Sequence, residues 1–175
     1  KTTPACHRSP WLRSILPDHL TYRSSYNTQG AAPQAGVSVS CHKAIAARVL
    51  TEVLPTPPSP SGFLTHIRIT VPLGTPRHLI GVYQPCHPYK RRIDTAAALN
   101  KYILSARQPF PNDHFLLAGD LNAALQPSDR FGHALHPTDC TLPNLLSSCN
   151  LVCAFSRCRD KPPHTFYSST TSSRL

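Results

Sequence analysis

The sequence predicts an α/β fold built around a mixed, largely antiparallel sheet. Three observations favour this class. Apolar and polar residues alternate with a period of two over residues 37–42 and 63–71, which is typical of strands with one buried face. Residues 92–107 instead repeat their apolar side chains every three to four positions, as an amphipathic helix does. Strands and helices that alternate along a chain, with hairpins between some strands, indicate an α/β protein.

The first third of the chain contains one clear strand. Residues 1–34 are rich in proline, serine, threonine and basic residues, so we expect irregular structure there, with at most a short element near 11–16. Residues 37–42 alternate valine and cysteine with serine and histidine and predict a strand. The apolar stretch 45–54 fits a strand or a short helix. The proline-rich stretch 55–62 continues neither and predicts a surface loop.

The middle of the chain predicts a hairpin and a helix. Residues 63–71 and 78–83 read as two strands, and the connection PLGTPR between them suits a hairpin. The helix over 92–107 would begin with Asp94 and Thr95 in its first turn. The side chains expected along one face of the first strand are Phe63, Thr65, Ile67, Ile69 and Val71, and those expected along the helix stripe are Ile93, Ala97, Asn100 and Leu104, adjoined by Ala96, Leu99 and Ile103.

Residues 114–125, HFLLAGDLNAAL, predict a buried strand that ends in Gly-Asp-Leu-Asn. Period-two alternation would place Asp120 and Asn122 on the same side of its exit, at the end of a central strand. After it we expect a polar loop over 126–139, a short helix over 142–148, a strand over 151–155 and a last short strand in the stretch HTFYS. A carboxylate and an amide would thus project together from a rigid element.

Composition indicates one domain with a basic surface. The 175 residues are 40% apolar, which suffices for a single core. The chain begins at Lys1 and contains no methionine, so we expect a piece of a longer protein. No apolar stretch approaches the ~18 to 20 residues that span a bilayer, and no signal peptide is recognisable, so we expect a soluble protein without a membrane partner.

Charge and cysteine usage narrow the partners. The formal net charge of +10 favours a polyanion such as nucleic acid, although a basic surface without a partner fits the charge equally well. The seven cysteines are odd in number and include no C-x-x-C pair, so we expect reduced intracellular thiols rather than a zinc site or a disulfide framework.

Four stretches, taken in order, resemble the endonuclease/exonuclease/phosphatase superfamily, which has the DNase I-like fold, and especially the apurinic-type endonuclease domains of non-LTR retrotransposons. These stretches are AGVSVS, LIGVYQP, LLAGDLNAAL with its trailing SDR, and HTFYSSTTSSRL. The resemblance implies a partial DNase I-like four-layer α/β sandwich and a single domain over residues 1–175, truncated at both ends. It also implies that DNA is the partner and that the protein is intracellular with access to the nucleus.

By the same resemblance the chain is a metal-dependent endonuclease or phosphodiesterase. Asp120 would position the attacking water, Asn122 would hold the scissile phosphate or the catalytic groups, and Tyr83 would offer its phenol to the phosphate. Thr165 would be a lesser member of the site, and Gly119 would leave the approach open. Tyr83 and Thr165 also have plain structural readings, as a half-buried ring and as a strand threonine. We expect the polar side chains to face one cleft.

The sequence departs from the family pattern at the metal site. The resemblance implies Mg²⁺, but the glutamate of the family's Gln-Glu-Thr motif has no counterpart, because the single glutamate, Glu52, follows the Gly-Val strand and reads as a solvated charge. The family's final aspartate and histidine would lie beyond Leu175. We expect the ten histidines present to occupy surface or loop positions, and Cys153 stands where many relatives have an aspartate.

These departures keep three functions open. The first is Mg²⁺-dependent DNA nicking by a retrotransposon-type protein, of which this fragment by itself would be inactive. The second is a phosphomonoesterase of the same superfamily that acts on a lipid or inositol phosphate. The third is a catalytically decayed remnant that binds nucleic acid or nothing.

Overall fold

The computed structural model describes residues 16–23, 36–56, 63–85, 88–125 and 134–154. The chain divides into two compact units, unit 1 (Lys1–Asn122) and unit 2 (Ala123–Leu175). A single domain over residues 1–175 stays a prediction. Among the described residues, no helix combines the length and the apolar character that crossing a bilayer requires.

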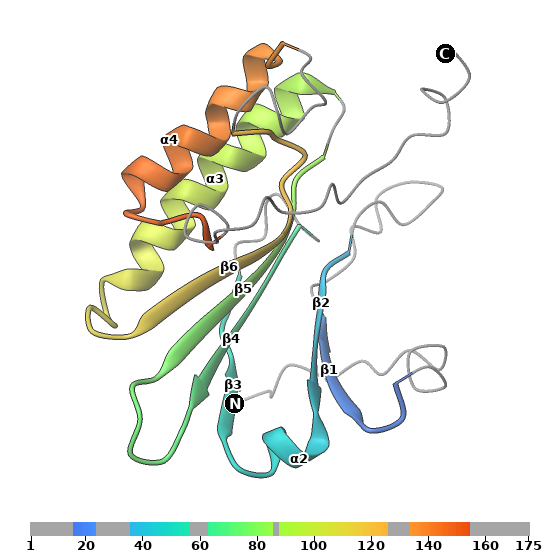
Figure 1. Ribbon diagram of the computed structural model, residues 1–175, viewed down its shortest axis with the longest axis vertical. Helices are drawn as coiled ribbons and strands as arrows, with labels where there is room; N and C mark the ends of the chain where they lie inside the picture. Colours follow the sequence, from blue (N-terminus) through green and yellow to red (C-terminus); the bar gives the residue numbers. More distant parts are fainter. Residues whose placement is uncertain (1–15, 24–35, 57–62, 86–87, 126–133, 155–175) are drawn as a thin grey trace. The chain divides into compact units, whose positions relative to one another are not determined.

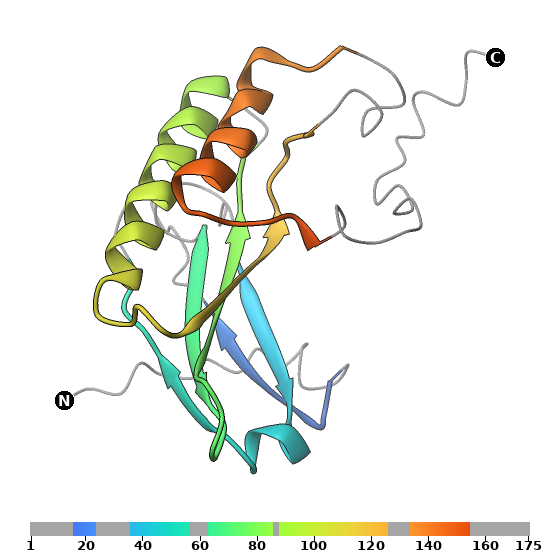
Figure 2. The ribbon, with the colours of Figure 1, turned by 60° about the vertical axis from the view of Figure 1, so that its left-hand side comes forward.

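Unit 1 contains two sheets and one long helix (Figure 1). The smaller sheet pairs β1 (His19–Arg23) with β2 (Ser38–His42) in antiparallel fashion. The larger sheet has the order β3-β4-β5-β6, and its strands are β3 (Leu50–Val53), β4 (Leu64–Thr70), β5 (Arg77–Tyr83) and β6 (His114–Asp120). The first three strands are antiparallel, and β6 runs parallel to β5 (Figure 2). The α/β class with a mixed, largely antiparallel sheet is therefore confirmed.

The first half of strand β4 is buried on both faces, which corrects the prediction of one buried face. Residues Phe63 to Ile67 are all buried, whichever way their side chains point. The reason is that each face of the sheet has its own cover. Gly81 on β5 shows the cover on one side, because a Cβ there would collide with Val37 and Thr65. Glycine at this position lets the smaller sheet approach the larger one closely.

Helix α3 (Tyr89–Arg107) covers the opposite face of the larger sheet (Figure 1). The predicted helix is confirmed, but it begins at Tyr89, so Asp94 and Thr95 lie beyond its first turn. The buried stripe is also rotated from the predicted one. Ile93 and Leu104 are 49% and 45% exposed, and the buried residues are Arg92, Thr95, Ala96, Leu99 and Ile103. The sheet, rather than the apolar pattern of the helix, decides which face is covered.

The ambiguous stretch 45–54 contains both of the predicted alternatives. Helix α2 (Lys43–Ala46) begins after His42, whose Nδ1 accepts a hydrogen bond from the backbone N–H of Ala44. This bond satisfies one of the N–H groups that the start of a helix leaves without a partner. Strand β3 then follows.

Three consecutive layers are thus present in unit 1. They are helix α3, the larger sheet and the smaller sheet, in that order (Figure 1). This arrangement is consistent with part of a four-layer sandwich, and the described residues of unit 1 supply no element for the fourth layer.

Unit 2 contains the 3₁₀ turn η2 (Pro137–Cys140) and helix α4 (Thr141–Ser148), which confirms the predicted short helix. Asp139 organises the turn. Its side chain accepts hydrogen bonds from the backbone N–H of His136 at 2.8 Å and of Ala124 at 3.4 Å, although it is almost fully buried. The predicted loop over 126–139 therefore ends in a structured turn, and residues 126–133 lie outside the described part.

The predicted strand at 151–155 is wrong for residues 151–154, which are described and form no strand. The end of α4 explains the error. Asn150 adopts the left-handed conformation with φ 47°, and the N–H groups of Asn150 and Leu151 donate to the carbonyls of Ser147 and Leu146. This pair of hydrogen bonds is the Schellman motif, in which a left-handed residue such as asparagine ends the helix. The stretch 11–15 and the HTFYS strand lie outside the described residues.

Candidate functional site

Strands β5 and β6 bring two sequence motifs together at their carboxyl ends. Tyr83 and Asp120 are register partners on these parallel strands, and the N–H of Gln84 donates to the Asp120 carbonyl at 2.8 Å. Because the strands are parallel, whatever follows each of them emerges at the same edge of the sheet. The Tyr-Gln-Pro and Gly-Asp-Leu-Asn segments therefore form one local structure.

The packing of the two strands explains why glycine occupies position 119. Its φ of 144° lies where residues with a side chain are strained, and a Cβ would collide with the carbonyl oxygen of Val82. The glycine allows β6 to approach β5 closely just before Asp120. The contact between two strands therefore accounts for this residue without reference to a substrate.

Asn122 lies differently from the prediction. Strand β6 ends at Asp120 and Asn122 has φ 46°, so period-two alternation does not continue between the two residues. Instead the N–H of Asn122 donates to Asp120 Oδ1 at 2.9 Å, and its Nδ2 donates to the Gln84 carbonyl at 2.6 Å. The second bond joins the two motifs through a side chain. It uses one of the two amide N–H donors of Asn122.

Asp120 and Tyr83 differ in exposure. The Asp120 side chain is exposed, whereas Tyr83 is half-buried and its ring stacks on Phe63 with the centroids 6.0 Å apart. The guanidinium of Arg91, from the first turn of α3, lies 4.8 Å from the Phe63 ring centroid. Phe63 therefore contacts both the Tyr83 ring and an arginine. A phenol and a guanidinium are groups that can donate hydrogen bonds to a phosphate.

Strand β6 is the outermost of the described strands of its sheet, not a central one. Leu116 on this strand is 58% exposed. Thr165 and the SDR segment lie outside the described residues, so their placement stays a prediction. Cys153 is half-buried after helix α4.

The described residues offer no cluster of ligands for the implied Mg²⁺. This cation takes oxygen ligands in octahedral geometry, and no group of three His, Cys, Asp or Glu side chains that could hold a metal ion occurs in the described part of the chain. Glu52 is exposed on β3 and pairs in register with Arg68, which lies at the opposite end of β4 from Phe63. The one glutamate therefore lies away from Asp120.

Two histidines that we expected at the surface are fully buried. His66 on β4 and His78 on β5 are each 0% exposed. The sequence carried a signal for this, because each lies two positions from a core residue, Leu64 or Ile80, and therefore on the same face of its strand. We refer to His66 and His78, with Tyr102, Asp113 and Arg68, as the histidine network.

The histidine network is a continuous chain of hydrogen bonds. Hydrogen bonds join Tyr102 Oη to His66 Nδ1 at 2.6 Å and His66 Nε2 to His78 Nδ1 at 2.8 Å. Two more join His78 Nε2 to Asp113 Oδ2 at 2.9 Å and Arg68 Nε to the same oxygen at 3.0 Å. Burial, and to a lesser extent His78, lowers the pKa of His66 to about 4. Burial raises the pKa of Tyr102 to about 12.

Asp113 carries the negative charge of this network. Burial raises the pKa of its carboxyl, but hydrogen bonds from His78 and Arg68, together with their charges, lower it by more, so the pKa lies below its ordinary value. The carboxylate therefore stays ionised at neutral pH.

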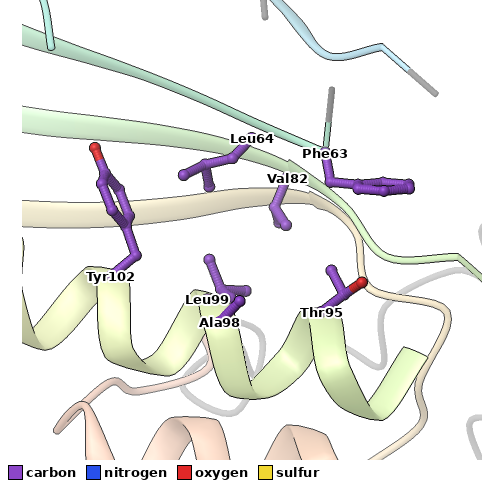
Figure 3. A pocket seen from close by; sticks show the side chains of 7 residues that line it. All are labelled: Phe63, Leu64, Val82, Thr95, Ala98, Leu99 and Tyr102. Atoms are coloured by element: carbon purple, nitrogen blue, oxygen red, sulfur yellow. The ribbon is translucent and has the colours of Figure 1, made fainter. Parts of the chain in front are cut away.

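A small apolar cavity lies between helix α3 and the larger sheet (Figure 3). Its volume of about 10 Å³ holds one water molecule at most. The residues that line it are Phe63, Leu64, Val82, Thr95, Ala98, Leu99 and Tyr102. The cavity belongs to the packing of the core and offers no space for a substrate.

Comparisons with known proteins give little beyond these observations. No family model and no curated protein matches the chain. A crystal structure of D. rerio TDP2 complexed with single strand DNA product is similar over 73% of this chain and 48% of that chain, with 14% sequence identity and a TM-score of 0.44. This chain therefore spans about half the length of that protein.

Proposed function

We propose that this chain is part of a Mg²⁺-dependent phosphodiester hydrolase of the endonuclease/exonuclease/phosphatase superfamily, a DNA-nicking endonuclease of the retrotransposon type. The observation that carries the proposal is the junction at the ends of β5 and β6. There Tyr83 and Asp120 are register partners, and Asn122 is bonded to the residue that follows Tyr83. The two motifs on which the resemblance depends are far apart in the sequence and form one structure.

Each residue has a role that its environment supports. The exposed carboxylate of Asp120 orients the attacking water as a general base. The second amide N–H of Asn122 and the phenol of Tyr83 donate to non-bridging oxygens of the phosphate. Thr165 is a further member of the site. A bound Mg²⁺ would offset negative charge on the phosphate, and no ligand for it is assigned among the described residues.

DNA is the proposed partner, and the nucleus is the proposed place of action. The net charge of +10 supports a polyanionic partner through phosphate contacts and counterion release. Binding to duplex DNA should be largely independent of sequence and should fall steeply from ~50 to ~200 mM salt. A gel-shift titration measures this. Affinity that does not change over this range, or no binding at ~50 mM salt, would contradict the choice of DNA.

A decayed remnant is the second candidate, and the position of Glu52 favours it. The single glutamate of the chain lies exposed on β3, at the level of Arg68 rather than of Phe63 and Tyr83. It cannot replace the metal-binding glutamate of the family in that place. A remnant would keep the affinity for DNA and lose the hydrolysis.

The decisive experiment compares this chain with a version extended at both ends by its own coding sequence. Nicking of supercoiled plasmid is measured with Mg²⁺ and with EDTA, and release of phosphate from an inositol polyphosphate is measured in parallel. The extended chain should nick DNA only with Mg²⁺, and the 175-residue chain should be nearly inert. Asp120→Asn in the extended chain should lower the rate by about 10² to 10⁴.

Asp94→Asn is the matched control, because Asp94 is an exposed carboxylate on α3 outside the proposed site. It should leave nicking unchanged. An Asp120→Asn variant as active as its parent would remove the role given to Asp120. No nicking by the extended chain would favour the remnant, and phosphate release without nicking would favour the phosphomonoesterase.

A further inference from the structure

The histidine network makes more hydrogen-bond contacts than its neutral side chains have protons. Four contacts need one proton each: Tyr102 to the Pro55 carbonyl, Tyr102 to His66, His66 to His78, and His78 to Asp113. Two neutral imidazoles and one phenol carry only three protons between them. One further proton completes all four contacts.

The direction of each bond then follows from the contact at Pro55. Tyr102 donates its only proton to the Pro55 carbonyl at 3.1 Å, so its oxygen must accept from His66 Nδ1. His66 Nε2 must then accept from His78 Nδ1, and His78 Nε2 donates to Asp113. His78 therefore carries both ring protons and is an imidazolium. The low pKa of the Asp113 carboxyl keeps the proton on the ring.

We propose that the histidine network is a proton-operated switch that couples the charge of His78 to the contact between Tyr102 and Pro55. In the charged state all four contacts are made, and Tyr102 holds Pro55. In the neutral state the bonds reverse: His66 Nε2 donates to His78 Nδ1, and Tyr102 donates to His66 Nδ1. Tyr102 then has no proton for the Pro55 carbonyl.

The contact that is lost in the neutral state, between Tyr102 and the Pro55 carbonyl, lies at the surface. Both states of the network are therefore accessible. Pro55 is exposed, so water can replace the Tyr102 hydroxyl on its carbonyl. Every contact between fully buried groups survives the reversal, since only its direction changes. A change that leaves no buried polar group without a partner costs little free energy.

The surroundings accept one added proton and resist a second. His78 stacks on Phe115 with the centroids 4.2 Å apart and lies against the Asp113 carboxylate, and both favour a cation. Arg68 on β4 shares Asp113, Arg107 of α3 lies over the Phe115 ring, and Glu52 on β3 is exposed beside Arg68. The pKa of about 4 for His66 opposes a second charge.

Nitrogen-detected correlation spectra of the two imidazole rings test the switch on the whole chain, without any substitution. From pH 8.5 to pH 5, His78 should change from the Nε2–H tautomer to the doubly protonated ring. Over the same pH range and with the same midpoint, His66 should change from the Nε2–H to the Nδ1–H tautomer. A His66 ring that keeps one tautomer while His78 titrates would overturn the proposal, as would two rings that do not change.

Tyr102→Phe sharpens the test. Without the hydroxyl, the two remaining contacts need only the two protons of the neutral rings, and an added proton at His66 Nδ1 finds no acceptor. The midpoint of His78 should fall by about one pH unit, a tenfold loss of proton affinity. Tyr89→Phe on the exposed start of α3 is the matched control and should leave the midpoint unchanged. A midpoint in Tyr102→Phe equal to or above that of the parent would contradict the switch.

Discussion

Strand β5 has a polar group at each end, and the two are built in opposite ways. Near its amino end, His78 is buried, and its hydrogen-bond partners come from β4 and from the loop before β6. At its carboxyl end, Tyr83 lies beside an exposed Asp120, and the polar groups bond mainly to the backbone. The sealed group stabilises the fold through completed hydrogen bonds, whereas the open group keeps polar atoms available to a ligand.

A buried titratable group and a reactive one differ in what their surroundings must supply. A buried polar group is costly unless every atom has a partner, so its neighbours are fixed by that requirement. An exposed carboxylate has no such constraint and can serve a reaction. Substitutions near the two ends of β5 should accordingly lower the stability of the fold to different extents.

His78→Leu should have the largest effect on stability. The substitution removes two hydrogen bonds and leaves His66 Nε2 without a partner, while Asp113 keeps only Arg68. We expect the free energy of unfolding to fall by about 4 kcal/mol. Urea denaturation at pH 7 measures it, and His114→Leu at an exposed position of β6 should cost less than about 0.5 kcal/mol. Similar costs for both variants would contradict the distinction between sealed and exposed histidines.

Acidification should have the second largest effect on stability, and it acts on the buried histidines near the amino end of β5. The pKa of His66 is lowered from 6.5 to about 4, so the unfolded chain binds a proton more readily than the folded one. The contribution of His66 is fully present above pH 6.5 and is lost as the pH falls to about 4, a change of about 3 kcal/mol. The lowered pKa of Asp113 acts in the same direction, because its contribution is lost as the carboxylate becomes protonated.

Urea midpoints between pH 7 and pH 4 measure this loss. His66→Gln removes the titrating ring and should make the dependence on pH shallower over the same range. An equally steep dependence in His66→Gln would show that other groups cause the acid sensitivity.

Gly119→Ala tests the close approach of β5 and β6 at their carboxyl ends. Its φ of 144° and the collision with Val82 should lower the free energy of unfolding by about 2 kcal/mol. Gly74→Ala is the matched control, because a Cβ there meets only Val71 at an ordinary 3.5 Å. It should be close to neutral in thermal unfolding. A Gly119→Ala variant as stable as Gly74→Ala would contradict the close approach of the strands.

Asn122→Gly should have the smallest effect on stability. Glycine keeps the left-handed backbone but removes the hydrogen bond to the Gln84 carbonyl, so we expect a loss of about 1 kcal/mol. Asn150→Gly, at a left-handed position that closes helix α4, is the control and should change the stability by a few tenths of a kcal/mol at most. Equal costs at the two sites would argue against a joining role for the Asn122 side chain.

Local sequence patterns predicted the positions of helices and strands better than they predicted which face of each is buried. The hairpin of β4 and β5, strand β6 and helices α3 and α4 follow from alternation, turn residues and helical spacing. The buried face of α3 did not follow, because Arg92 and Thr95 are buried while Ile93 is exposed. The predicted strand after α4 was wrong because a left-handed asparagine and its hydrogen bonds close the helix where that strand was expected to begin.

At the candidate site, too, the sequence predicted some features and the tertiary structure decided others. The residue types of Tyr83, Asp120 and Asn122 came from the sequence, and so did the expectation that they meet. The sequence by itself determined the α/β class, the basic charge and the positions of the main strands, because these depend on residue type and on spacing within one segment.

Only the tertiary structure decided that Asn122 bonds to Gln84 and that His66 and His78 form a sealed pair. Both depend on which strands become neighbours and in which register. Local sequence carries little information about a hydrogen bond between residues that are far apart in the chain. The packing of α3 and the pairing of β4, β5 and β6 supply it.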